Sequence, residues 1–180
     1  EIKKKYSKGK IKIGFFSTDF KTHSVSFFLE TIISNIEKKE FELFAFSNLE
    51  IDKHDEMTDN LKNNFDYWHD TINLSDSEFI ELTRNLKLDI LFDLSGFFSG
   101  NRIQAFRARC APVQISWLGY CNSLGIKNMD YIIADHNLIL QDEQQHYLEK
   151  ILYMPNIWSV ISLPKNLDQI KIKTNKKNNY

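Results

Sequence analysis

Residues 88–125 read LDILFDLSGFFSGNRIQAFRARCAPVQISWLGYCNSLG, in which two short apolar runs each lead into a loop that contains glycine. The runs are Leu88–Leu94 and Val113–Leu118, and a helical pattern over Arg102–Arg109, ended by Pro112, joins them. Short apolar runs bounded by turn residues are typical of strands in a parallel sheet covered on both faces. Ligands of open α/β sheets bind outside the carboxyl ends of the strands, so both loops are candidates for a site.

The rest of the chain continues this alternation of strand and helix patterns. Further strands are predicted at Lys10–Ser17, Phe41–Ser47, Phe65–Trp68, Asp130–Asp135 and Lys150–Met154. Helices are predicted at His23–Glu37, Glu56–Lys62 and from a Ser75–Glu78 capping box to about Leu86. We therefore expect an α/β fold, a mostly parallel sheet of about six strands with helices on both faces.

Composition places the chain among ordinary globular proteins. Its 180 residues are 42% hydrophobic and 26% charged, and the formal net charge is -1. This near-neutral charge gives no long-range attraction to nucleic acid or to an anionic membrane, and no apolar run is long enough for a membrane span. Cys110 and Cys121 have no His or Cys at metal-ligand spacing. We predict free thiols in a reducing compartment, hence a cytoplasmic protein.

Both ends of the chain differ in composition from the middle. Residues 1–9 are lysine-rich and are predicted to be a linker, whereas residues 165–180 are polar and are predicted to be a connector. Residues 10–164 would then form one folded unit. Connectors on both sides indicate that further domains could flank this unit.

Four motifs occur in one order along the chain. They are Asp19-Phe20-Lys21-Thr22-His23-Ser24-Val25, the DLSG of 93–96, the APVQISWLGY of 111–120 and the MDYIIAD of 129–135. Together they resemble the catalytic region of the O-linked N-acetylglucosamine transferases, a family that includes the plant Spindly proteins and bacterial relatives. The resemblance extends over about residues 10–155.

This resemblance implies a fold and an activity. The family's catalytic region is a pair of Rossmann-like lobes (the GT-B arrangement), usually preceded by tetratricopeptide repeats, and the match covers only the amino-terminal lobe. The implied reaction moves a sugar from a nucleotide donor, UDP-N-acetylglucosamine or the fucose donor of Spindly proteins, to Ser or Thr hydroxyls of proteins. The resemblance implies no metal or other cofactor. Because most nucleotide contacts come from the carboxy-terminal lobe, we expect this chain alone to be inactive.

His23 and Asp19 are the first candidate site residues. The resemblance places His23 in the cleft near the donor sugar and the acceptor hydroxyl, either as a base or as a positioning group. A histidine titrates near neutrality and suits both roles. From the residues alone, a helix cap is the favoured role of His23, and it is the resemblance that favours the site. Asp19, in the same loop, either lines the site or serves as a turn residue that bonds nearby backbone.

The two glycine loops supply the other candidates. Gly96 follows a strand, and many bacterial relatives carry a histidine at the next position, where this chain has Phe97. The later loop usually reads GYPGT in the family but here contains Gly119, Tyr120, Asn122 and Ser123. We expect this loop to line the cleft, with Tyr120 either stacking on a sugar or packing against the protein.

These departures from the family pattern motivate an alternative function. A non-catalytic binding or scaffold module derived from the same fold would not need a polar side chain at Phe97 or the usual loop. An unrelated nucleotide-binding domain is disfavoured, because the chain has no glycine fingerprint for phosphate. The arginines at 102, 107 and 109 are predicted to form a solvated helix face.

Overall fold

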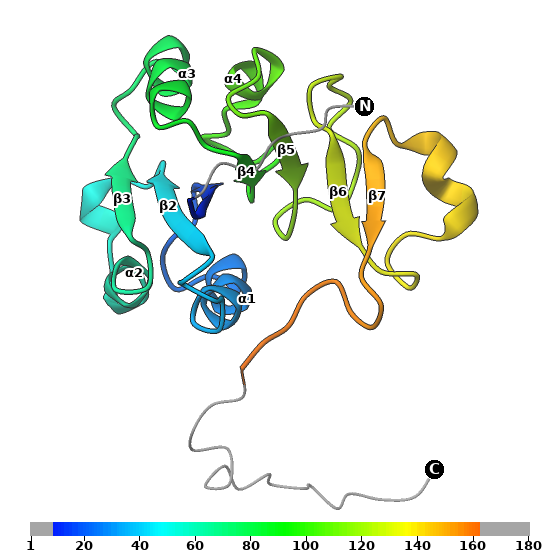
Figure 1. Cartoon of the computed structure of the whole chain (residues 1–180), viewed down its shortest axis with the longest axis horizontal. Helices are drawn as coiled ribbons and strands as arrows, with labels where there is room; N and C mark the ends of the chain where they lie inside the picture. The colour runs from blue at the N-terminus through cyan, green and yellow to red at the C-terminus, as the bar shows by residue number, and fades with distance from the viewer. Residues whose placement is uncertain (1–8, 163–180) are drawn as a thin grey trace, which may run out of the picture.

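The computed structural model describes residues 9–162, which form a parallel sheet with helices on both faces (Figure 1). Its strand order is β3-β2-β1-β4-β5-β6-β7, so the sheet has seven strands rather than about six. The predicted connector at 165–180 and all but the last residue of the predicted linker at 1–9 lie outside the described residues.

The strands lie close to their predicted positions. They are β1 Ile11–Ser17, β2 Phe41–Ser47, β3 Tyr67–Asp70, β4 Ile90–Asp93, β5 Val113–Ser116, β6 Tyr131–Ala134 and β7 Lys150–Tyr153. All six neighbouring pairs are parallel, with Ile13 of β1 opposite both Leu43 and Ile90. The predicted α/β class with a parallel sheet is therefore confirmed.

β3 begins two residues later than the sequence predicted. The N–H of Phe65 bonds to the carbonyl oxygen of Leu61, so Phe65 belongs to the turn that follows the helix at Glu56–Lys62. Its ring packs at the edge of Phe15, with 5.8 Å between the ring centroids. Phe65 thus contributes to the core from a turn and not from a strand.

Four α-helices within residues 9–162 cover the two faces of the sheet. They are α1 Ser24–Ile33, α2 Glu56–Lys62, α3 Asp76–Asn85 and α4 Ile103–Arg107, with short 3₁₀ turns η1 Ile51–Lys53 and η2 Gln141–His146. Figure 1 shows α1 and α2 on one face and α3 and α4 on the other. Each pair of helices covers its own cluster of buried hydrophobic side chains. None of these helices is long and apolar enough to cross a membrane.

Local sequence explains where the helices begin. In α3 the Ser75 hydroxyl accepts the N–H of Glu78 at 3.3 Å, and the Glu78 carboxylate accepts the N–H of Ser75 at 2.8 Å. This is the predicted capping box. α1 is shorter than predicted, since it ends at Ile33.

The prediction of a solvated arginine face is wrong for Arg102. Its side chain is 6% exposed and forms an ion pair of 2.9 Å with Asp76 at the start of α3. Arg109 is half-buried and pairs with Asp130 at 2.8 Å, and only Arg107 is exposed. The helix over 103–107 is short and lies close to α3, so the arginine that precedes it points inward.

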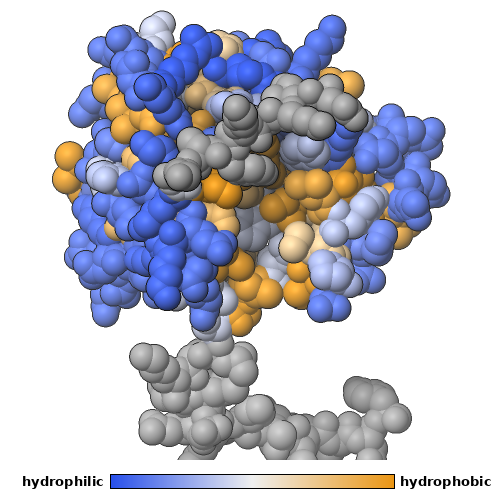
Figure 2. All heavy atoms as spheres, in the orientation of Figure 1, coloured by the Kyte–Doolittle hydropathy of each residue, from blue (hydrophilic) through white to orange (hydrophobic). Residues whose placement is uncertain are grey.

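Hydrophobic side chains also gather on the surface near the end of the described chain. The exposed members are Leu152, Met154, Ile157, Val160 and Ile161. Figure 2 shows hydrophobic side chains in the lower central part of the molecule, on the α1 side of the sheet. The segment after β7 crosses here, and the Trp117 indole N–H donates to the carbonyl oxygen of Trp158 at 2.9 Å.

The strand order creates a crevice at the carboxyl ends of the strands. β1 lies between β2 and β4, so the chain leaves β1 toward one side of the sheet and later returns on the other side. The connections that follow β1 and β4 therefore lead to helices on opposite faces of the sheet. Ligand sites of open α/β sheets lie at such a switch of strand order.

Candidate functional site

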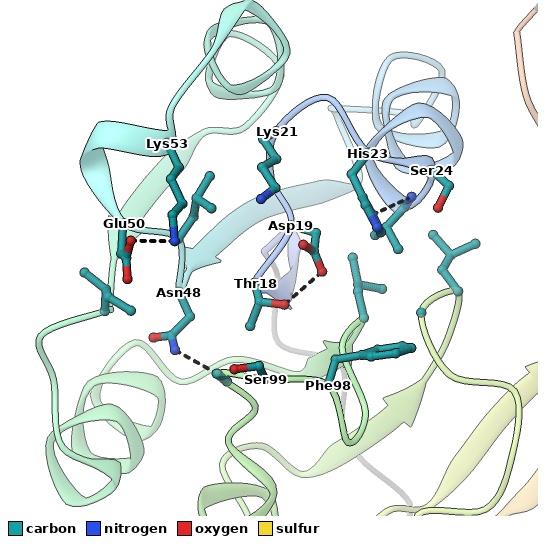
Figure 3. Close-up of a pocket in the computed structure, with 17 residues that line it drawn as sticks. Thr18, Asp19, Lys21, His23, Ser24, Asn48, Glu50, Lys53, Phe98 and Ser99 are labelled. Atoms are coloured by element: carbon teal, nitrogen blue, oxygen red, sulfur yellow. Dashed lines mark hydrogen bonds and ion pairs between the residues drawn. The ribbon is translucent and has the colours of Figure 1, made fainter.

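A cavity of about 580 Å³ lies at this crevice (Figure 3). It is lined by loops that follow β1, β2, β4 and β5, together with the start of α1. The lining includes Thr18, Asp19, Lys21, His23, Ser24, Asn48, Glu50, Lys53, Phe98, Ser99, Gly100, Leu118 and Gly119. Residues far apart in the sequence meet here because the strands are parallel, so their carboxyl ends lie at the same end of the sheet.

The loop after β1 is held at both ends. The Asp19 N–H donates to the Ser17 hydroxyl at 3.0 Å, and the Thr18 hydroxyl donates to the Asp19 carboxylate at 2.9 Å. Further along, the Thr22 N–H donates to the Asp55 carboxylate at 2.7 Å. This bond and those from Thr58 lower the pKa of Asp55 to about 2. The loop is thereby tied to the start of α2.

His23 caps a helix and also lines the cavity. It is the N-cap of α1, and its Nδ1 atom accepts the N–H of Val25 at 3.3 Å. The same side chain is exposed and lines the cavity. An Nδ1 that accepts a hydrogen bond carries no proton, so in the neutral ring the proton is on Nε2. The free edge of the imidazole therefore offers an N–H donor.

Asp93, at the end of β4, organises the next loop. Its carboxylate is 2% exposed and accepts the N–H of Ser95 at 2.9 Å and that of Gly96 at 3.2 Å. The Ser95 hydroxyl then accepts the N–H of Thr18 at 3.0 Å. The loops after β4 and β1 are thus joined beneath the cavity. Burial raises the pKa of Asp93 to about 6, although the two N–H groups oppose this shift.

We expect Asp93→Asn to change the pH dependence of stability. The folded protein keeps the proton of Asp93 up to about pH 6, whereas the unfolded chain loses it near its ordinary pKa of 3.8. Folded protein binds more protons between these values, so the parent loses stability as the pH rises through this window. Asparagine keeps an oxygen for Ser95 and never ionises. The variant should gain on the order of 3 kcal/mol relative to the parent between about pH 4 and 7.

The measurement for Asp93 is urea unfolding of both proteins across that pH range. The difference in unfolding free energy between the two proteins isolates Asp93 from other titrating groups. A difference that stays constant between about pH 4 and 7 would show that Asp93 does not titrate there.

The loops after β4 and β5 approach each other closely. Gly96 has a φ of +57°, and a Cβ at this position would overlap the Tyr120 side chain. A Cβ on Gly119 would overlap the carbonyl oxygen of Leu94. Glycine is therefore required at both positions, in one case by the left-handed φ and in both by contact.

Charges of both signs surround the cavity. Lys53 pairs with Glu50 at 2.6 Å across η1. Figure 3 shows Lys21 and Lys53 directed toward the same space between the loops. Among residues 9–162, Lys21 has no ion pair within 4.0 Å. The same part of the chain contains no group of three or more His, Cys, Asp or Glu side chains that could hold a metal ion.

Comparison with known proteins identifies the family. The sequence pattern of glycosyl transferase family 41 matches residues 1–179. The chain belongs to glycosyl transferase family 41. Its resemblance to the O-linked N-acetylglucosamine transferases and Spindly proteins is thereby confirmed.

Relatives with curated names support the same family. One from Arabidopsis thaliana, named "Probable UDP-N-acetylglucosamine--peptide N-acetylglucosaminyltransferase SPINDLY", is 31% identical over 150 residues, which are 81% of this chain and 16% of that protein. A protein of the same name from Oryza sativa subsp. japonica is 30% identical over 147 residues, 79% of this chain and 16% of that protein. This chain of family 41 therefore spans about one sixth of the length of these relatives.

Solved structures agree with this fold. A mutant of the Thermobaculum terrenum O-GlcNAc transferase superposes with a TM-score of 0.83 at 33% identity, covering 88% of this chain and 30% of that chain. The lipopolysaccharide outer core galactosyltransferase WaaB superposes with a TM-score of 0.54 at 19% identity, covering 81% of this chain and 46% of that chain. The second likeness concerns the fold alone. The described residues thus form a Rossmann-like lobe of the glycosyltransferase type.

Some of the predicted site residues lie together at the cavity. Asp19, His23 and Gly119 line the cavity, whereas the other candidates, Gly96, Phe97, Tyr120, Asn122 and Ser123, are not among its lining residues. Any substrate contact by this second group stays a prediction.

The second group has visible packing roles. The Phe97 ring, 50% exposed, packs edge-on against Tyr120, with 5.5 Å between the centroids. The Ser123 hydroxyl donates to the buried Glu149 carboxylate at 2.6 Å and accepts the N–H of Gly125 at 3.1 Å. Ser123 therefore stabilises its own loop.

Several residues that line the cavity were not predicted from the sequence. Lys21 lies inside the motif that contains His23, but only its position in the loop shows that it faces the cavity. Asn48 follows β2 directly, so the rule that ligands bind at carboxyl ends of strands identifies it in principle. Lys53 and Ser99 lie in polar loops with no distinguishing sequence pattern.

Proposed function

We propose that this chain is the amino-terminal lobe of a protein O-glycosyltransferase that moves N-acetylglucosamine from UDP-N-acetylglucosamine to Ser or Thr hydroxyls. The observation that carries this proposal is the cavity at the switch of strand order, lined by His23, in a chain of family 41. The name of the Arabidopsis relative supports the donor and the peptide acceptor.

His23 acts in this proposal as a hydrogen-bond donor at the reacting centre. Its Nδ1 is engaged by Val25, so Nε2–H is the atom that faces a substrate oxygen. A fixed donor at a centre where charge develops stabilises the transition state. Asp19 lines the same cavity, and its carboxylate is oriented by the Thr18 hydroxyl.

A second lobe completes the enzyme in this proposal. The diphosphate of the donor would be stabilised by that lobe, without a metal ion, and tetratricopeptide repeats in the same protein would help to bind the acceptor. The proposed setting is cytoplasmic. The partners are the nucleotide sugar and the acceptor protein, with no role for nucleic acid.

One observation favours a second candidate function, a non-catalytic binding module. Phe97 places a half-exposed aromatic ring beside the half-exposed ring of Phe98, and both pack on Tyr120. An apolar surface of this kind suits contact with protein better than contact with a sugar phosphate. Loss of transfer in the complete protein would favour this module.

We expect the full-length protein that contains this chain to transfer sugar, and residues 1–180 alone to transfer none. The isolated chain lacks the lobe that would stabilise the leaving diphosphate. The measurement is transfer of radiolabelled N-acetylglucosamine from UDP-N-acetylglucosamine to serine peptides. GDP-fucose is the control donor, and a preference for it would revise the donor. A full-length protein inactive with both donors would refute the proposed activity.

A further inference from the structure

Asn48 lines the cavity directly after β2, and its side chain is held at both ends. Its Oδ1 atom accepts a hydrogen bond from Arg102 Nη2 at 3.0 Å. Its Nδ2 atom donates to the carbonyl oxygen of Gly100, in the loop after β4, at 2.8 Å (Figure 3). The amide thus connects two walls of the cavity.

Arg102 is itself fixed in place by other partners. Its guanidinium group donates to the Asp76 carboxylate at 2.9 Å and to the carbonyl oxygens of Thr71 at 2.6 Å and Leu74 at 2.8 Å. It also lies 5.1 Å from the centroid of the Phe79 ring. A buried arginine with this many partners has one orientation, so Nη2 faces Asn48 from a fixed position, and its two hydrogens are shared among the oxygens of Asn48, Thr71 and Leu74.

These partners leave the Asn48 amide only one possible orientation. Guanidinium groups donate only and carbonyl oxygens accept only, so a flipped amide would lose both bonds. The Thr71 hydroxyl, 3.1 Å from Oδ1, adds a further possible donor on the same side. Nδ2 carries two hydrogens, and Gly100 takes one of them. Within residues 9–162 the other N–H has no partner, and Asn48 lines the cavity.

We propose that Asn48 is a substrate-binding residue whose free Nδ2–H donates to a carbonyl or phosphoryl oxygen of the bound substrate. This inference rests on the proposed function, because it assigns Asn48 and one hydrogen bond to the substrate site of that function. The required chemistry is an oxygen that accepts a hydrogen bond. Lys21 also lines this cavity, and its positive charge favours such an oxygen, whereas the charge of Lys53 is paired with Glu50.

That oxygen belongs to one of two substrates. The nucleotide sugar carries phosphoryl and acetyl oxygens, and the acceptor peptide carries backbone carbonyl oxygens. Both present the same chemistry to Asn48. Measuring the affinity for each substrate separately distinguishes them.

The test is Asn48→Asp in the full-length protein. The carboxylate has the same shape and still accepts from Arg102, but it loses the bond to Gly100 and faces that carbonyl oxygen. We therefore expect the melting temperature to fall by roughly 2–8 °C, as in the control below. The substitution replaces the donor at Nδ2 with a negative oxygen, which repels a carbonyl or phosphoryl oxygen. We expect the KM, and the dissociation constant from calorimetry, to rise about tenfold or more for one of the two substrates. The probes are UDP-N-acetylglucosamine and a serine peptide that the parent modifies.

Asn128→Asp is the matched control. Asn128 also lies between an arginine and a carbonyl oxygen, with Nδ2 2.6 Å from the Arg107 oxygen and Oδ1 3.5 Å from Arg109 Nη2. It does not line the cavity. Its variant should bind both substrates as the parent does. If Asn48→Asp does not fold, Asn48→Thr, whose hydroxyl still accepts, takes its place.

The outcomes separate the inference from the proposed function. An Asn48 variant that binds both substrates within twofold of the parent overturns the inference, as does an equal loss in the Asn128 variant. A parent that binds substrate but transfers no sugar refutes the proposed activity alone, and the calorimetric constants then decide on Asn48. A parent that binds neither substrate overturns both.

Discussion

Replacing His23 by alanine in the full-length protein is expected to lower turnover by roughly 10²–10⁴-fold, the usual contribution of a positioned proton-transfer or hydrogen-bonding group. The side chain is exposed to the cavity, so its removal takes little from the core. Loss of the cap to Val25 costs about 1 kcal/mol, which lowers the melting temperature by roughly 2–4 °C. Turnover and melting are to be measured on the same preparations.

The variant His23→Asn distinguishes the helix-capping role of His23 from its proposed role in the reaction. Asparagine is among the best N-cap residues, so this variant should melt at or above the parent temperature. Its side chain is shorter and cannot place a donor where Nε2 lies. We expect turnover to fall as far as in the alanine variant. Turnover close to that of the parent in His23→Asn would show that His23 is only a cap.

Arg102→Met is expected to have the largest effect on stability, a loss of roughly 2–4 kcal/mol. Methionine fills a similar volume but removes the Arg102 donor from the carbonyl oxygens of Leu74 and Thr71, of which Thr71 keeps the N–H of Leu74. The ion pair to Asp76 is lost as well, although Asp76 is 42% exposed and water can replace its partner. The melting temperature should fall by roughly 5–15 °C.

Arg107→Met provides the control for this measurement. Arg107 belongs to the same short helix, but its side chain is exposed. The identical substitution there should change the unfolding free energy by no more than about 0.5 kcal/mol. Urea unfolding of both variants measures the two losses of unfolding free energy. Equal losses would show that the buried contacts of Arg102 contribute nothing beyond the effect of removing a positive charge.

The fold was predictable because its signals are local. The apolar runs of β1, β2, β4 and β5 and the capping box of Ser75 and Glu78 each occupy a few consecutive residues. Strand and helix patterns of this kind constrain backbone conformation without reference to distant residues. β3 was misplaced by two residues because Phe65 is apolar, as a strand residue would be, yet bonds backward to α2.

The site was predictable only where a motif contained it. Asp19, His23 and Gly119 lie in motifs shared with the family, and they line the cavity. Gly96 was also singled out, but it serves the close approach of two loops and does not line the cavity. Lys21 lies in the same motif as His23, but the motif does not show that its side chain lines the cavity, and Asn48 is marked only by its position after a strand.

Local patterns in this chain therefore specify the order of strands and helices, the parallel sheet and the end of the sheet at which the cavity lies. They leave open that Arg102 is buried, that Asp93 joins two loops, and that Asn48 has one orientation. Arg102 is 26 residues from Asp76 and 54 from Asn48 in the sequence, and Thr18 is 77 from Ser95. Contacts over such separations exist only after the sheet has assembled. Which polar groups pair is then set by the loss of water around them, because a buried donor or acceptor must find a partner.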